Sequence, residues 1–427
     1  MADSKSVSII NAGLDIGNGY VKALVKNPII DAKAAAVDMP SAAAAITNSA
    51  DVRISDQAAI AREFADIYNA LEVSIDSPLV YDGGLRMYIG KRAIKSGKSL
   101  QEFNLKEARR SKSEAELSAI LTLSILAGKA LTDYYNTHDQ TLPKADEIID
   151  ISAKLAISLP IGEYKVSKNQ VARNYMAQSH MVRIHNFEDL IQVVIHITAV
   201  EVAPEGASAQ FAIASKGERF MLALVTNMVK NGVQIPEDIK PADIMAAGGI
   251  IGVDIGEGTV NFPIYQDMKF NPDTSSTFNK GYGSVMDEAV ARLQQMGRPF
   301  DTRKKLVEWL LEAEKKPLMR RQYVEAMGIV NEEISIFTDE LVRQFSSVLE
   351  RNGAFAEVVY VYGGGATPVQ ASLYPKLNQA IQRAFGETVF MPVLYLDSSY
   401  SRCLNRDGLY LLAASDDPKS IDDLRQA

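Results

Sequence analysis

Two short stretches of the sequence combine a carboxylate and two glycines in the same order. Asp15-Ile16-Gly17-Asn18-Gly19 follows an apolar run at 6–14, and Asp254-Ile255-Gly256-Glu257-Gly258 follows a second run at 249–253. Because glycine adopts positive φ without strain, each stretch predicts a tight β-hairpin whose turn N–H groups can close around an anion. The Asp at the end of each strand is suited to hold a cation through its water shell. The predicted chemistry is therefore the binding of a phosphate group with its counter-ion.

A single turn of this kind would be weak evidence, since Asp-x-Gly-x-Gly is also an ordinary way to reverse a strand. The repetition favours a nucleotide site, because two equivalent hairpins could hold the phosphates of one nucleotide from both sides of a cleft. We therefore expect a duplicated, two-lobed nucleotide-binding protein.

Two further glycine-rich segments could bring backbone close to a ligand. Lys280-Gly281-Tyr282-Gly283 precedes a helix expected at 285–296. Gly363-Gly364-Gly365-Ala366 follows a strand expected at 357–362, and a flat ring or a ribose could lie against its backbone. The alternative for the triple glycine is a plain tight turn between a strand and a helix.

The elements that must position these residues follow from hydrophobic periodicity. Residues 29–56 are rich in alanine and serine, have little periodicity and are expected to cross the surface of the first lobe. The strand at 191–202 leads into Pro204-Glu205-Gly206, and such strand-to-helix turns carry functional residues in open α/β sheets. The other expected elements are strands at 154–160 and 388–396 and helices at 208–231, 302–316 (capped by Asp301) and 323–349.

Length and composition limit the possible functions. A chain of 427 residues predicts at least two domains, and its net charge of −8 disfavours direct binding of nucleic acid. The single Cys403 excludes an intrachain disulfide and a cysteine-built zinc site. No apolar run approaches the roughly 18–20 residues that span a bilayer. We expect a cytoplasmic protein without membrane contact, for which any DNA would be held by a separate basic adaptor.

Taken in order, Asp15-x-Gly-x-Gly-x-x-Lys22, Asp254-x-Gly-x-Gly-Thr259 and the strand followed by Gly363-Gly364-Gly365 resemble the actin, Hsp70 and sugar-kinase ATPase superfamily. The resemblance covers most of the chain as an ordered skeleton. It implies an α/β, two-lobed, actin-like fold (a duplicated ribonuclease H-like fold) with ATP or ADP and Mg²⁺ in the cleft between the lobes. The implied domains are domain I at 1–248 plus 398–427, with a subdomain insertion at about 30–150, and domain II at 249–397.

The resemblance also implies roles for individual residues. Lys22 is expected on the β- and γ-phosphates, and Asp15 and Asp254 are expected to hold Mg²⁺ through water. The expected nucleotide-binding residues are Asp15, Gly17, Asn18, Gly19, Tyr20, Lys22, Gly256, Glu257, Gly258, Thr259, Gly281, Gly283, Gly363, Gly364, Gly365 and Ala366.

Within that superfamily the chain is most similar to the ParM-type bacterial actins, whose filaments segregate low-copy plasmids. Leu-Pro-Ile-Gly-Glu-Tyr at 159–164 is similar to a Leu-Pro-x-x-Glu-Tyr stretch of that group. Val-Ala-Pro-Glu-Gly at 202–206 resembles its strand-Pro-Glu turn, so Glu205 is expected to position the attacking water, with Asp254 assisting as a second catalytic residue. The resemblance implies ATP hydrolysis coupled to polymerisation, self-association into filaments and a DNA-binding adaptor protein as partner.

Two other functions remain compatible with the same motifs. One is a small-molecule, sugar-type kinase, which would need a catalytic Asp facing an acceptor hydroxyl, and the sequence nominates none. The other is an ATPase of the same superfamily that does not polymerise.

Overall fold

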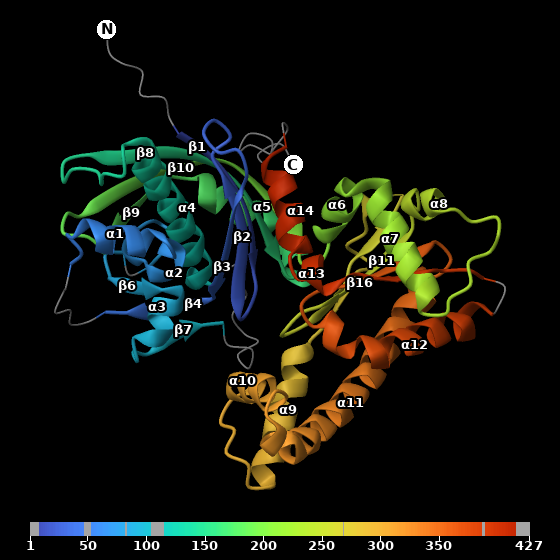
Figure 1. The fold of residues 1–427 in the computed structure, drawn as a ribbon. Coiled ribbons are helices and arrows are strands. Elements are labelled where there is room, and N and C mark those ends of the chain that lie inside the picture. Colours follow the sequence, from blue (N-terminus) through green and yellow to red (C-terminus); the bar gives the residue numbers. More distant parts are fainter. Residues whose placement is uncertain are drawn as a thin grey trace. The chain divides into compact units, whose positions relative to one another are not determined.

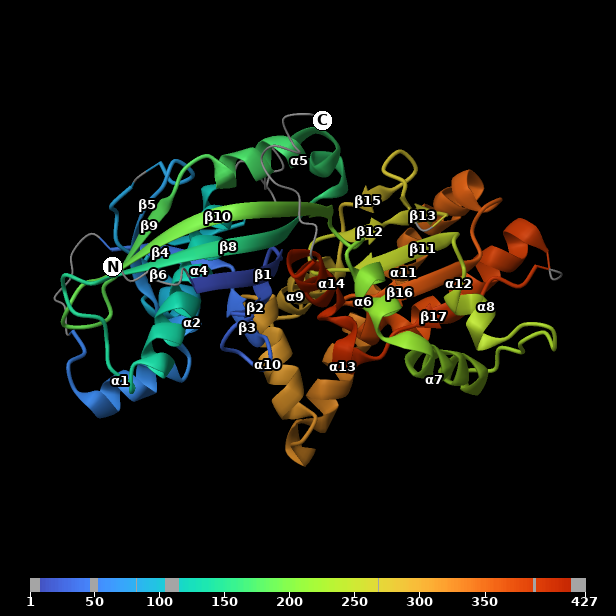
Figure 2. The same cartoon turned by 90° about the horizontal axis from the view of Figure 1, so that it is seen from above.

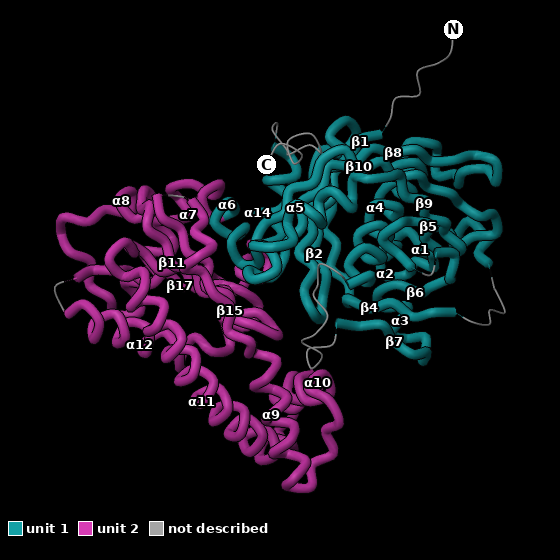
Figure 3. The backbone as a smooth tube through the Cα atoms, turned by 180° about the vertical axis from the view of Figure 1, so that it is seen from behind, with its two compact units in different colours: residues 1–212, 405–427 teal, residues 213–404 magenta. Residues whose placement is uncertain are grey.

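The chain folds into two compact units in a computed structural model that describes residues 8–46, 53–81, 83–103, 115–267, 269–386 and 389–415 (Figure 1). Unit 1 contains residues 1–212 and 405–427, and unit 2 contains residues 213–404 (Figure 3). The sequence analysis placed α7 (Gly217–Lys230) in the first domain. In the structure this helix packs on β17 (Val393–Tyr395), so it belongs to unit 2.

Ten strands among the described residues of unit 1 form one mixed sheet in the order β3-β2-β1-β8-β10-β9-β5-β6-β4-β7. Strand β1 is antiparallel to β2 and parallel to β8, and β8 is parallel to β10, so β1, β8 and β10 lie side by side (Figure 2). The strands are β1 (Ser8–Ile16), β2 (Tyr20–Lys26), β3 (Ala35–Pro40), β4 (Ala42–Ala45), β5 (Glu72–Asp76), β6 (Met87–Ile89), β7 (Leu100–Glu102), β8 (Ile148–Leu159), β9 (His180–Ile184) and β10 (Ile191–Pro204).

Helices cover both faces of this sheet. Helix α4 (Glu116–Thr137) packs on the face that carries Ile10 and Leu14, in the large core of the unit. Helix α14 (Leu404–Ala413) packs on the opposite face, where Leu409 and Ala413 contact Ala156 and Ala203. The other helices are α1 (Gln57–Phe64), α2 (Ile67–Ala70), α3 (Gly90–Lys95), α5 (Ile161–Met176) and α6 (Ala209–Ser215), of which α6 extends past the boundary at residue 212.

The expectation that residues 29–56 cross the surface is wrong for residues 37–46, most of which are buried. Strands β3 and β4 lie within the segment 29–56, and Ala42, Ala43 and Ala44 are buried. Ala42 and Ala44 pack against Ala93 of α3. A run of alanines carries no alternation of large apolar and polar side chains, so its strand character is invisible to a periodicity argument. Residues 47–52 lie outside the described residues.

Seven strands in the described part of unit 2 form a second sheet, in which β11 pairs with β12, β13 and β16. The strands are β11 (Ile250–Ile255), β12 (Val260–Phe262), β13 (Ile264–Gln266), β14 (Lys269–Phe270), β15 (Ser276–Phe278), β16 (Val358–Tyr362) and β17. The helices are α7, α8 (Pro241–Met245), α9 (Tyr282–Gln295), α10 (Arg303–Ala313), the 3₁₀ helix η2 (Pro317–Met319), α11 (Arg320–Asn352), α12 (Ala366–Phe385) and α13 (Ser398–Ser401).

Three expected elements differ from the structure in their limits. The helix expected at 208–231 is two helices, α6 and α7, which separate where Gly217 takes a φ of +70°. Helix α10 is capped by Thr302 rather than Asp301, because the Thr302 side chain accepts the Lys305 N–H. The strand expected at 388–396 is the shorter β17. Thr388, the first residue of the expected strand, lies outside the described residues.

Within the ranges given above, no helix combines the length and the hydropathy needed to span a bilayer.

The close approach of α14 to the rest of unit 1 predicts a stability difference between two helical glycines. A Cβ added to Gly408 would lie 1.8 Å from the Ser208 carbonyl oxygen, whereas one added to Gly162 in α5 would meet nothing within 4 Å. We expect Gly408→Ala to lower the free energy of unfolding by about 1–3 kcal/mol through overpacking. Gly162→Ala should leave it unchanged or raise it by about 0.5 kcal/mol. Urea unfolding followed by circular dichroism measures both, and equal effects would contradict the tight contact.

Candidate functional site

The first predicted turn is a tight β-hairpin between β1 and β2, as the sequence analysis expected. The Gly17 N–H donates to the Tyr20 carbonyl oxygen over 3.0 Å, and a Cβ on Gly17 would lie 2.8 Å from that oxygen. Asn18 and Gly19 complete the turn, and Tyr20 begins β2. Only glycine fits at position 17 without moving the turn.

The neighbouring strand holds this turn through a residue that the sequence analysis missed. Ser41, directly after β3, donates its N–H to the Gly19 carbonyl oxygen at 3.0 Å and its hydroxyl to the Gly17 carbonyl oxygen at 2.7 Å. The Ser41 side chain is buried. No motif marks this serine, because its role arises only when β3 is laid beside β2.

Lys22 and Asp15 face each other across the hairpin. They are paired residues on β2 and β1, and the Lys22 ammonium lies 3.4 Å from an Asp15 carboxylate oxygen. Their side chains are 18% and 14% exposed, respectively. Both predicted charges of the first turn therefore stand at the same end of the hairpin, with the cation beside the carboxylate.

Glu205 lies at the same edge of the sheet as Asp15. Leu14, Ile157 and Val202 are in register across β1, β8 and β10, and all three strands run parallel toward this edge. The Glu205 N–H donates to the Leu159 carbonyl oxygen over 2.7 Å, so Glu205 directly follows the last pairing of β10 with β8. Two strand spacings separate β1 from β10, roughly 10 Å. Unit 1 thus carries two carboxylates at the carboxyl ends of parallel strands, where open α/β sheets bind ligands.

The second predicted turn joins β11 to β12 in unit 2 with the same hydrogen bond as the first. The Gly256 N–H donates to the Thr259 carbonyl oxygen over 2.9 Å, and Asp254 stands opposite Asn261. Asp254 is 6% exposed and also lies beside Tyr362 of β16. Gly258 completes the turn between Glu257 and Thr259.

The glycines at 281 and 283 lie against this second turn. The Tyr282 N–H donates to the Gly256 carbonyl oxygen at 2.9 Å, and the Gly283 N–H donates to the Glu257 carbonyl oxygen at 2.8 Å. A Cβ on Gly281 would lie 2.5 Å from the Glu257 oxygen, so the approach requires glycine. Burial raises the pKa of Tyr282 above its ordinary value, so the phenol stays neutral.

The triple glycine lies on the other side of β11. The Gly365 N–H donates to the Ile255 carbonyl oxygen over 2.8 Å. Gly363 has a φ of +99°, and a Cβ there would lie 2.4 Å from the same oxygen. Ala366 begins α12 and is buried. The structure therefore brings three predicted glycine segments of unit 2 together around one strand end.

Arg303 is a second residue that the sequence analysis missed. Its guanidinium lies 3.0 Å from a Glu257 carboxylate oxygen and 3.3 Å from an Asp287 carboxylate oxygen. A Cβ on Gly283 would meet the same guanidinium. The pairing places a cation beside the second turn, and nothing in the sequence around the start of α10 indicates it.

The chemistry of both turns fits an anion with a hydrated cation. Each turn offers backbone N–H groups next to a strand-end carboxylate, and the carboxylates of Asp15 and Asp254 are the oxygen ligands that Mg²⁺ accepts through water. In the part of the chain described here, no group of three or more His, Cys, Asp and Glu residues could hold a metal ion directly.

Two family models match the two halves of the chain. The model described as "Actin like proteins N terminal domain" matches residues 13–207, and the model described as "Archaeal actin homologue MreB-like, C-terminal" matches residues 252–374. The first match contains the Gly17 turn and Glu205, and the second contains the Gly256 turn and the triple glycine. No curated protein sequence matches the chain.

Solved structures of actin-like proteins share the fold at low sequence identity. Bacillus thuringiensis ParM with ATP has a TM-score of 0.56 and 15% identity, over 95% of this chain and 98% of that one. The actin-like protein Alp7A has a TM-score of 0.60 and 15% identity, over 95% and 96%. The archaeal actin homolog Ta0583 has a TM-score of 0.57 and 12% identity, over 95% and 99%. A Bacillus thuringiensis ParM hybrid protein with ADP, which contains two ParM mutants, has a TM-score of 0.56 and 16% identity over 96% of this chain. The chain spans about half (49%) of that hybrid's length.

The triple glycine contains a matched pair for a test of its backbone. A Cβ on Gly364 would meet only Arg402, at an ordinary 3.7 Å, whereas Gly363 combines a positive φ with a clash. We expect Gly363→Ala to lower the free energy of unfolding by about 1–3 kcal/mol and Gly364→Ala to change it by less than about 0.5 kcal/mol. Thermal unfolding of both variants checks this, and a stable Gly363→Ala would show that the turn does not depend on its left-handed residue.

Proposed function

Because the chain belongs to the actin-like proteins, we propose that its two glycine turns bind one ATP molecule with Mg²⁺ and that the protein hydrolyses ATP as it assembles into filaments. The observation that carries the proposal is the repeated hairpin. Each unit closes an Asp-x-Gly-x-Gly turn with the same glycine N–H to carbonyl hydrogen bond and presents a strand-end carboxylate beside it.

Binding of the phosphates is assigned to backbone and one lysine. The N–H groups of residues 18–19 and 257–259 are proposed to contact phosphate oxygens, and the Lys22 ammonium to offset the charge of the β- and γ-phosphates. Gly281, Gly283 and Gly363–Ala366 would lie along the nucleoside. Gly364 supports this part of the proposal. Gly363 and Gly365 must be glycine because a Cβ would clash with the protein, but a Cβ on Gly364 would not. A nucleoside lying against the backbone would explain why position 364 is also glycine.

Hydrolysis of a γ-phosphate needs charge neutralisation and a positioned water more than covalent catalysis. Mg²⁺, when bound, supplies part of that neutralisation, and Asp15 and Asp254 are proposed to hold its water ligands. Glu205 is proposed to orient the attacking water, with Asp254 assisting. Its place at the carboxyl end of β10, two strands from Asp15, supports this role.

A role in plasmid DNA segregation is proposed from the family resemblance. The net charge of −8 makes direct DNA contact unfavourable, so a DNA-binding adaptor protein is the proposed link between filament and plasmid, and the cytoplasm the proposed location.

The catalytic assignment predicts a separation of binding from turnover. Glu205→Ala should reduce phosphate release by about 10²-fold, the usual contribution of a positioned general base, while ATP affinity changes little. Filaments formed with ATP should therefore persist longer than those of the wild type. Glu218→Ala, which removes an exposed carboxylate on α7, is the control and should release phosphate at the wild-type rate. Wild-type release by the Glu205 variant would remove this residue from the mechanism.

Assembly is tested separately from chemistry. We expect micromolar protein to sediment with ATP and Mg²⁺ and to stay in the supernatant without nucleotide, because closure around the nucleotide is proposed to favour subunit contacts. Electron microscopy of the pellet should show filaments. Absence of nucleotide-dependent pelleting over a range of salt concentrations would reject the filament proposal, and ATP hydrolysis without it would favour a non-polymerising ATPase.

A further inference from the structure

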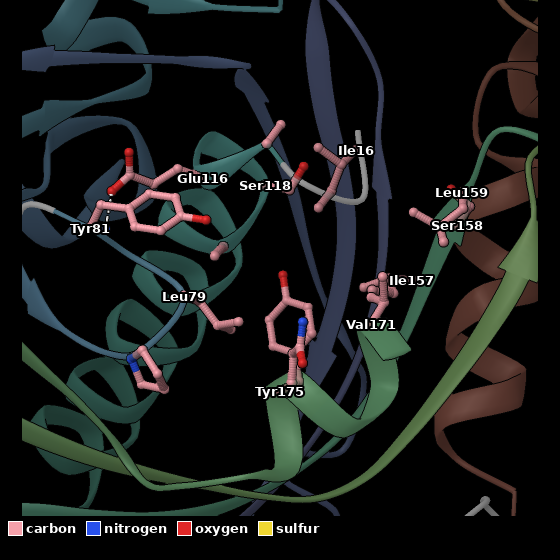
Figure 4. A pocket seen from close by; sticks show the side chains of 14 residues that line it. Ile16, Leu79, Tyr81, Glu116, Ser118, Ile157, Ser158, Leu159, Val171 and Tyr175 are labelled. Atoms are coloured by element: carbon pink, nitrogen blue, oxygen red, sulfur yellow. Dashed lines mark hydrogen bonds between the residues drawn. The ribbon is translucent and has the colours of Figure 1, made fainter. Parts of the chain in front are cut away.

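A cavity of about 170 Å³ lies in unit 1 on the face of the sheet covered by α4 and α5 (Figure 4). Ile16 at the end of β1 and Leu159 at the end of β8 form part of its wall. The apolar side chains around it also include Leu79, Ala119, Ile157 and Val171. Neither the turn glycines nor Glu205 line it, so the cavity is distinct from the proposed nucleotide site.

A buried tyrosine hydroxyl faces this cavity, and the buried Ser158 also lines it. Tyr175 of α5 is 5% exposed, and Figure 4 shows its hydroxyl pointing into the cavity toward Ser118. The Tyr175 hydroxyl reaches Thr122 Oγ1 only at 3.5 Å, well beyond the usual 2.7–2.8 Å of an O–H···O hydrogen bond. Burial raises the pKa of Tyr175 to about 12, so the group is a neutral donor. A buried hydroxyl with so weak a bond gains free energy from a better partner.

The lining also limits the charge of an occupant. None of the lining residues that the structure describes is Lys, Arg or His, so these residues offer an anion no counter-charge. The carboxylate of Glu116 already accepts the Tyr81 N–H at 2.6 Å. A cavity of about 150 Å³ with apolar walls is large enough to hold benzene. Size, wall and donor therefore fit one aromatic ring with one polar, uncharged substituent.

We propose that this cavity binds a small uncharged aromatic molecule carrying one hydroxyl group, and that its binding is transmitted to the two strand ends of the candidate site. The hydroxyl of the ligand bonds to the Tyr175 hydroxyl, and the ring fills the space between Ile16, Leu159 and Leu79.

Transmission follows from the position of two wall residues. Ile16 is bonded directly to Gly17, whose N–H closes the first turn. Leu159 accepts the Glu205 N–H through its carbonyl oxygen at 2.7 Å. A ligand that displaces either side chain therefore displaces the turn or the carboxylate. An effect on ATP turnover, as opposed to ligand binding, rests on the proposed function.

Binding is tested with two probes, 4-fluorobenzyl alcohol and 4-fluorotoluene, titrated up to about 5 mM and followed by fluorine NMR of the full chain. Tyr175→Phe removes only the hydroxyl and should weaken binding of the alcohol about fivefold to tenfold, while fluorotoluene binds as before. Ser118→Leu, which fills the cavity, should weaken both probes. Val166→Ala, at an exposed position of α5, is the control and should change neither.

Two outcomes would overturn the binding proposal. One is a wild type that binds neither probe, and the other is that Tyr175→Phe and Ser118→Leu both bind the alcohol with wild-type affinity. Circular dichroism establishes that each variant is folded, and because Tyr175→Phe keeps the ring, it preserves the packing if Ser118→Leu does not fold.

Transmission is tested without nucleotide, by the backbone amide resonances of Gly17 and Glu205. Both should shift with the same dissociation constant as the probe, while the amide of Gly97, in an open turn, should not. Unshifted Gly17 and Glu205 resonances in probe-saturated protein would overturn the transmission. A protein that shows these shifts but does not bind ATP would contradict the proposed function and leave the cavity proposal intact.

Discussion

Two backbone hydrogen bonds set the geometry on which the candidate site depends, Gly17 N–H to Tyr20 O and Gly256 N–H to Thr259 O. Each closes a turn so tight that a Cβ at the glycine would lie within about 3 Å of the accepting oxygen. The surrounding elements then donate hydrogen bonds to the carbonyl oxygens of the turns. Ser41 donates to those of Gly17 and Gly19, and the N–H groups of Tyr282 and Gly283 donate to those of Gly256 and Glu257. Because carbonyl oxygens repel phosphate, occupying them within the protein leaves the N–H groups that follow Gly17 and Gly256 as the part of each turn available to an anion.

Each turn also keeps a carboxylate beside a cation, Asp15 with Lys22 and Glu257 with Arg303. The second pair is partly exposed, and the first has a separation of 3.4 Å, longer than a strong charge-assisted hydrogen bond. A partly exposed pair such as Glu257–Arg303 contributes only about 0–1 kcal/mol to stability. A polyanion can therefore recruit Arg303 without a large loss of folding free energy.

The hairpins and the glycine segments could be predicted from the sequence because each is a local pattern whose residues are neighbours in the chain. Ser41 and Arg303 could not, since their contacts with Gly17 and Glu257 join segments that no local pattern relates. The buried strand at Ala42–Ala45 was missed for a different reason, the absence of any contrast between its two faces. The sequence predicts Asp301 rather than Thr302 as the cap of α10 because both residue types cap helices. Only the fold decides which of them directly precedes the first helical residue. That the two turns serve one nucleotide stays a prediction.

The position of Glu205 is set by an irregularity far from it. In the first half of β10 the buried residues are Ile191, Val193, Ile195 and Ile197, which alternate with less buried neighbours. The pairing with β8 shifts register between Ile197 and Ala199, and beyond this bulge the alternation continues through Val200 and Val202. The extra residue at this bulge changes which positions of β10 face the core, so that Val200 and Val202 stand opposite the buried Leu155 and Ile157. Without the extra residue, Glu201 and Ala203 would stand opposite Ile157 and Leu159 in place of Val202 and Pro204. The turn that carries Glu205 would then begin on the other face of the sheet.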